Sequence, residues 1–134
     1  MQISSFADLL QAARQQDTPQ RLFFVFAAAE LPEDASPAQR ARYAAGGGGA
    51  LTPVMAVDKS PDDLPSFDAL VEESRHTGTH WDMVFVTTQA MPDGPLPDAT
   101  QVEQTLTELI ERIRLGQIDS FLTFNRQGSL VQLR

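Results

Sequence analysis

The run Leu22–Ala29 constrains the fold of this chain more than any other feature, because it is continuously apolar and aromatic. A strand with one solvated face would alternate apolar and polar residues, so this run predicts a strand that is covered on both faces. We interpret it as the central strand of a sheet, which requires packing layers above and below.

Capping residues mark where four helices are expected to begin. Ser5 precedes the apolar positions Phe6, Leu9, Leu10 and Ala13, Ser36-Pro37 precedes a short alanine-rich helix ending at Gly46, Ser66 precedes Phe67, Leu70 and Val71, and Asp98 with Gln101 forms a capping box. Each combines an N-cap side chain with helical apolar spacing.

Three further segments are predicted to form strands. Pro53 within Leu51–Val57 removes a ladder donor, so this segment is predicted to be a strand that lies at an edge or starts after the proline. In Trp81–Thr88, alternation places Trp81, Met83, Phe85 and Thr87 on one face and Val84 and Val86 on the other. The end of the chain, from Phe121 to Leu133 with Gly128 in its turn, predicts a hairpin.

These elements predict one globular domain over residues 1–134, of class α+β or α/β. We expect a single mixed sheet of about five strands, packed by about four helices and ending in a C-terminal hairpin. A chain of this length buries about two-thirds of its unfolded surface, so it needs no disulfide or metal for stability.

Charge and composition exclude several classes of protein. A net charge of −8 repels phosphate backbones, which argues against nucleic-acid binding. No apolar run reaches the roughly 20 residues that span a bilayer, and the N-terminus lacks the pattern of a leader, so we expect a cytoplasmic, bacterial-type protein without membrane contact. With no cysteine, thiol chemistry and iron–sulfur ligation are excluded.

No cofactor is expected from the motifs. Lys59-Ser60 follows a glycine run, but Asp58 stands where a phosphate-binding loop needs glycine. Glu72, His76 and His80 have the four-residue spacing of metal ligands on a helix, whereas Gly78 is expected to end that helix before His80. A solvated helix end is the alternative, and we expect no metal site.

A candidate ligand site comes from topology. Glu30, Asp58, Lys59 and Thr87 fall at or near the ends of expected strands, and parallel strands would bring them to one rim. The alternative for Asp58 and Lys59 is an ion pair between surface neighbours.

The glycine run Gly46–Gly49 adds backbone entropy that folding must overcome, so it marks a flexible loop or a close-approach surface. We expect Gly46 to cap the preceding helix and Gly47 and Gly48 to form a mobile connection.

Five segments together resemble a small family of uncharacterised proteobacterial proteins: Ile3–Leu10, Gln20–Ala27, Gly48–Met55, Val57–Lys59 and Trp81–Val86. Members often carry the label ribonucleotide reductase subunit alpha. Such a subunit uses paired cysteine thiols, and this chain has none, so the label cannot describe its chemistry. The resemblance implies a free-standing domain of unknown function.

The leading hypothesis is a non-catalytic interaction or regulatory protein with an unknown protein partner, or one that self-associates through the Phe121–Leu133 hairpin, whose edge leaves ladder groups unpaired. The alternative is a small ligand-binding domain or enzyme that uses the acidic rim of Glu30, Asp58, Lys59 and Thr87.

Overall fold

The computed structural model describes residues 3–30, 36–44, 50–91 and 98–131. Its elements, in chain order, are α1 (Phe6–Arg14), β1 (Gln20–Glu30), α2 (Pro37–Ala44), β2 (Ala50–Lys59), the short helix η1 (Pro61–Asp63), α3 (Phe67–Arg75), β3 (Met83–Ala90), α4 (Ala99–Arg114), β4 (Leu122–Asn125) and β5 (Leu130–Val131). Within these ranges, no helix is both long and apolar enough to cross a bilayer.

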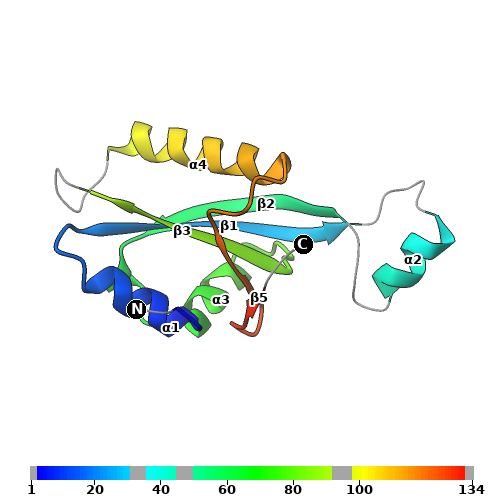
Figure 1. Cartoon of the computed structure of the whole chain (residues 1–134), viewed down its shortest axis with the longest axis horizontal. Helices are drawn as coiled ribbons and strands as arrows, with labels where there is room; N and C mark the ends of the chain where they lie inside the picture. Colours follow the sequence, from blue (N-terminus) through cyan, green and yellow to red (C-terminus); the bar gives the residue numbers. More distant parts are fainter. Residues whose placement is uncertain (1–2, 31–35, 45–49, 92–97, 132–134) are drawn as a thin grey trace.

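The strands form one five-stranded sheet in the order β2-β1-β3-β4-β5, and every neighbouring pair is antiparallel. The α+β class and the strand number are confirmed, whereas the mixed sheet and the α/β alternative are wrong. A parallel pair needs a crossover that carries the chain back along the sheet. Here α2 lies beyond the end of the β1–β2 pair, so β2 simply returns beside β1 (Figure 1).

Three helices pack on the sheet, not four. α4 covers one face, and α1 and α3 cover the other (Figure 1). The fourth helix, α2, begins after Ser36 as expected but stands beyond the sheet. The caps of the other three helices are confirmed, because Ser5, Ser66 and Asp98 each accept a hydrogen bond from a backbone N–H of the first turn.

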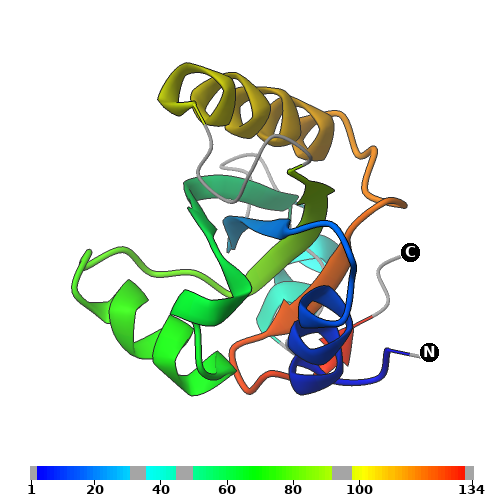
Figure 2. The ribbon, with the colours of Figure 1, turned by 90° about the vertical axis from the view of Figure 1, so that its left-hand side faces the viewer.

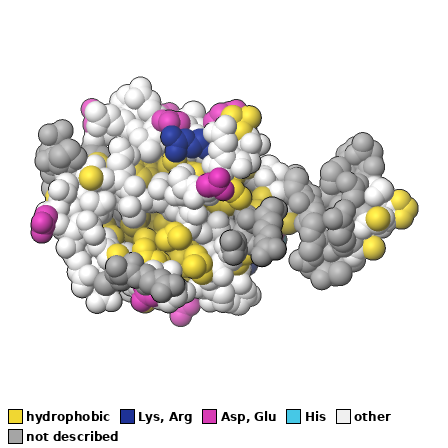
Figure 3. Space-filling model, viewed as in Figure 1, with side chains coloured by type: hydrophobic (Ala, Val, Ile, Leu, Met, Phe, Trp, Pro, Cys, Tyr) yellow, Lys and Arg dark blue, Asp and Glu magenta, His cyan; other side chains and the backbone are white. Residues whose placement is uncertain are grey.

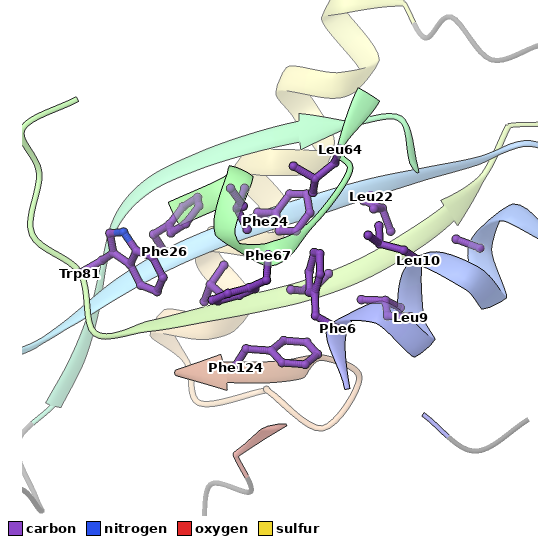
Figure 4. Close-up of a cluster of buried hydrophobic side chains, with 14 residues drawn as sticks. Phe6, Leu9, Leu10, Leu22, Phe24, Phe26, Leu64, Phe67, Trp81 and Phe124 are labelled. Carbon is purple, nitrogen blue, oxygen red and sulfur yellow. The ribbon is translucent and has the colours of Figure 1, made fainter. Parts of the chain in front are cut away.

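β1 explains the unbroken apolar run, because it contributes to two hydrophobic clusters. Phe24 and Phe26 belong to the cluster beneath α1 and α3, and Phe23 and Val25 to the cluster beneath α4. β1 is therefore covered on both faces, as predicted, although β3 and not β1 is the middle strand. Figure 4 shows the first cluster, in which aromatic rings from α1, α3 and β4 meet.

Trp81 lies on the opposite side of the sheet from the one expected. β3 begins only at Met83, so Trp81 does not follow the alternation of the strand. Its ring packs against Phe26, with centroids 5.0 Å apart, in the cluster beneath α1 and α3, whereas Phe85 faces α4. The faces assigned to Val84 and Val86, opposite Phe85, are correct.

The C-terminal hairpin is confirmed: β4 pairs with β5, and Gly128 in its turn has a φ of 83°. Ser5 also forms an antiparallel bridge to Ser129, so the N-terminal segment reaches the hairpin. The glycine run Gly46–Gly49 lies outside the described residues, and its flexibility stays a prediction.

Candidate functional site

The topology separates the residues expected at one rim. Because β1 and β2 are antiparallel, Glu30 pairs with Ala50 at one end of the sheet, whereas Asp58 and Lys59 pair with Phe23 and Leu22 toward the other end. The premise of parallel strands is therefore wrong, and Glu30 does not converge with Asp58. The sequence could not reveal this, since strand direction depends on how the connections run.

Asp58 and Thr87 do share a row of the sheet. Both pair with Phe23, from the two sides of β1, so all three side chains lie on the face covered by α4. Asp58 is held by Arg21, whose Nε and Nη2 atoms both lie 2.8 Å from its Oδ2 atom. The two side chains are only 16% and 20% exposed, so this carboxylate is already neutralised by a cation within the fold.

Arg21 is the partner that sequence reasoning missed. It stands two residues before Phe23, and residues two apart on a strand share a face. A charged residue at the start of an apolar run could have been noted as a candidate partner for a carboxylate on the neighbouring strand. Only the register of the strands identifies the strand that carries this carboxylate.

Lys59 belongs to the other face of the sheet. Its Nζ atom forms an ion pair with Oε1 of Glu73 on α3. Asp58 and Lys59 therefore have different partners on opposite faces, and the alternative of an ion pair between these two neighbours is wrong. The arrangement gives no pair of acid and base groups around a shared space.

The three candidate metal ligands of the sequence do not come together. Nε2 of His76, the residue that caps the end of α3, lies 3.9 Å from Oε1 of Glu72, but Nε2 of His80 lies 3.0 Å from Oδ1 of Asp82 instead. Gly78, with a φ of 71°, follows the end of α3 and separates the two histidines, as the sequence indicated. Among the described residues, no group of three histidine or acidic side chains is placed to hold a metal ion.

A depression of about 310 Å³ opens between one side of α1 and the N-terminal end of α3, beside the β4–β5 turn. Its lining includes Ser5, Ser66, Arg14 and Gln127. Arg14 donates to the carbonyl oxygens of Pro61 and Leu64, at 2.9 and 3.3 Å. The polar groups at its wall are thus largely occupied by the protein itself.

The first turn of α1 is stabilised by an acidic side chain. Backbone and side-chain hydrogen bonds from Ser4, with a smaller contribution from Ser5, lower the pKa of Asp8 below its usual value. This interaction is structural, because a carboxylate complements the positive end of a helix dipole.

The two borders of the sheet differ. On the β5 side, Ser5 bridges Ser129, and hydrophobic side chains gather on the surface of this side of the molecule (Figure 3). On the other side, β2 is the last strand of the sheet over ten residues, which confirms the edge predicted from Pro53. β2 is longer than β5, the last strand on the other side, and no described strand other than β1 pairs with it.

β2 is irregular at one point. Phe26 pairs with Met55 and Ala27 with Pro53, so Val54 is the extra residue of a β-bulge and is 36% exposed. From Met55 to Lys59 the pairing with β1 is regular. We call this regular segment, Met55–Lys59, the β2 edge.

No protein-family model, curated protein or solved structure matches this chain.

Proposed function

We propose that this chain is a non-catalytic protein-binding domain, which binds a partner through the border of its sheet at β2. The observation that carries the proposal is the β2 edge, which has a neighbour only on its β1 side within the described part of the chain. An unpaired strand presents backbone donors and acceptors that an extended segment of another protein can pair with.

The dispersal of the reactive side chains supports a binding role over catalysis. General acid–base and nucleophilic catalysis need groups within hydrogen-bond reach of one another and of a substrate. Here Asp58 is bound to Arg21 and Lys59 to Glu73, on opposite faces of the sheet. The resemblance to the family labelled ribonucleotide reductase subunit alpha adds no reactive group to this arrangement. Membership of that family stays a proposal.

Site-specific photo-crosslinking in the cells that make the protein tests the binding role. A benzophenone amino acid would replace Val54, which is exposed beside the β2 edge, and in a matched variant would replace Leu115, which is 63% exposed after α4. We expect a discrete heavier adduct from position 54 and none from position 115. Adducts of equal yield at both positions, or none at either, would contradict the proposal.

A second candidate function rests on the depression between α1 and α3. Its volume of about 310 Å³ is at the lower limit of small-molecule pockets. A ligand that binds there would raise the melting temperature, because it stabilises only the native state. A thermal-shift screen of metabolites and nucleotides that raises the melting temperature, with the shift lost on Gln127→Ala, would favour this function.

A further inference from the structure

Within the described part of the chain, the β2 edge lacks the proline, bulge or unpaired charge that usually protects an exposed strand. In edge strands, pairing with another chain is commonly prevented by proline, by a bulge or by charged side chains. In β2, the proline and the bulge stand together at Pro53 and Val54, before the regular segment begins. Beyond them, five consecutive residues pair regularly with β1, and no other strand of the described residues lies on their outer side.

The two charged residues of this segment do not prevent another strand from pairing with it. Asp58 is bound to Arg21 on the α4 face, and Lys59 is bound to Glu73 on the opposite face. Both side chains are therefore directed above or below the sheet and are already paired. Among the described residues, only β1 pairs with Met55–Lys59, so the outer side of this segment has no strand neighbour there.

The surface beside this edge is acidic. α3 lies against β2, since Glu73 pairs with Lys59 and the Thr77 hydroxyl lies 3.6 Å from the sulfur of Met55. Figure 2 shows α3 below β2 on the same side of the molecule. Residues 61–75, which include η1 and α3, contain five acidic residues and one arginine.

Much of this negative charge is accessible. The side chains of Asp62, Glu72 and Glu73 are 88%, 62% and 52% exposed, and Asp63 is also exposed. The nearby cations are Arg14, Lys59, Arg75 and, when protonated, His76, and each contacts one of these acids. The acids are more numerous than the lysine and arginine side chains beside them, and the whole chain carries a net charge of −8.

From this combination we propose that the occupant of the β2 edge is an extended, basic segment of another protein, which adds as a sixth strand beside Met55–Lys59 with lysine or arginine side chains toward the acids of η1 and α3. The inference rests on the proposed binding function and names the chemistry of the partner. Backbone hydrogen bonds would supply affinity, and the charges would supply selectivity. A second copy is a poorer occupant, because it would bring another net charge of −8 to the same border.

The test uses the full chain and a defined probe. The probe is an acetylated, amidated peptide of about seven residues that alternates lysine and valine, since this is close to the length of an ordinary strand. Binding is measured by fluorescence anisotropy, and its location by hydrogen exchange. We expect new protection of backbone amides within Met55–Lys59 and none in β4 or β5.

Two matched peptides separate the contributions of backbone and charge. The same peptide with alternate backbone nitrogens methylated cannot complete the ladder, and the peptide with glutamate for lysine reverses the charge; we expect each to bind at least about tenfold more weakly. Raising the salt from about 50 mM to about 300 mM should also weaken binding of the lysine peptide, because exposed charges are screened.

Two protein variants with equal changes in charge locate the recognition. Asp63→Asn with Glu72→Gln removes two charges beside β2, and Glu111→Gln with Asp119→Asn removes two exposed charges elsewhere. We expect about a fivefold loss of affinity in the first variant and less than a twofold change in the second, as surface pairs contribute modestly. All four side chains are exposed, so circular dichroism should show both variants folded.

Several results would overturn the inference. Equal binding of the glutamate peptide, protection at β4 and β5, or equal losses in the two variants would each show that the basic segment is not what this edge recognises. Protection of Met55–Lys59 that grows with protein concentration in the absence of peptide would identify a second copy as the occupant. If the crosslinked adduct at position 54 forms despite such results, the binding function stands and only the chemistry of the partner is wrong.

Discussion

At the residue scale, Trp81 shows how one polar atom fixes a buried side chain. The residue is fully buried, yet its indole N–H donates to the Ser74 hydroxyl at 2.9 Å. That hydroxyl in turn donates to the Val71 carbonyl of the preceding turn of α3. The Arg126 guanidinium lies over the ring, 4.5 Å from its centroid.

Replacing Ser74 with alanine should destabilise the protein by about 1–3 kcal/mol, because it leaves a buried N–H without its acceptor. The better helix propensity of alanine offsets only about 0.5 kcal/mol. Urea unfolding followed by circular dichroism measures the change. In a Trp81→Phe background the same substitution should cost much less, since the donor is gone; an equal cost in both backgrounds would show that the hydrogen bond is not the cause.

At the element scale, local chemistry predicted the helices well. Ser5, Ser66 and Asp98 cap α1, α3 and α4 because their side chains satisfy backbone groups a few residues away, which a sequence shows directly. Trp81 could not be placed in this way. Its side of the sheet depends on β3 beginning at Met83, and that start depends on pairing with β1.

Gly128→Ala should destabilise the hairpin more than Gly116→Ala does the end of α4. Both glycines have positive φ, 83° and 76°, so alanine costs about 1–2 kcal/mol at either position. At Gly128 the added Cβ would also lie 3.0 Å from the ring of Phe67, which packs on Phe6, whereas at Gly116 it meets open space. We expect an additional loss of about 1 kcal/mol or more at Gly128.

Thermal melts of the two glycine variants and the parent chain provide the comparison. Each kcal/mol should lower the melting temperature by roughly 3–5 °C for a chain of this size. Equal shifts for the two variants would mean that Phe67 moves aside without cost.

At the scale of the whole molecule, the sequence predicted that β1 is covered on both faces but not how its neighbours run. The apolar run predicts directly that both faces of β1 are buried. The direction of β2, in contrast, depends on the path of the chain beyond Glu30. For the same reason Asp58 was found as a candidate without its partner Arg21. The edge position of β2 was predictable, because Pro53 is a local signal of an unpaired border.

The shared strand β1 leads to a final prediction, that the two hydrophobic clusters unfold together. Leu109 on α4 is 7% exposed and belongs to the hydrophobic cluster between α4 and the sheet. Trp81 lies in the cluster on the opposite face of the sheet. Leu109→Ala should cost about 2–5 kcal/mol by loss of burial and creation of a cavity. Because residues of β1 alternate between the clusters, we expect the midpoints seen by Trp81 fluorescence and by circular dichroism to fall together.

Glu108→Ala, at an exposed neighbouring position of α4, serves as the control and should change stability by less than about 0.5 kcal/mol. A Trp81 transition that keeps its original midpoint in Leu109→Ala, while the helical signal is lost earlier, would show that α4 detaches as an independent unit. In that case the unfolding of one hydrophobic cluster would not require the unfolding of the other. Binding at the β2 edge would then have to be tested in a state from which α4 has detached.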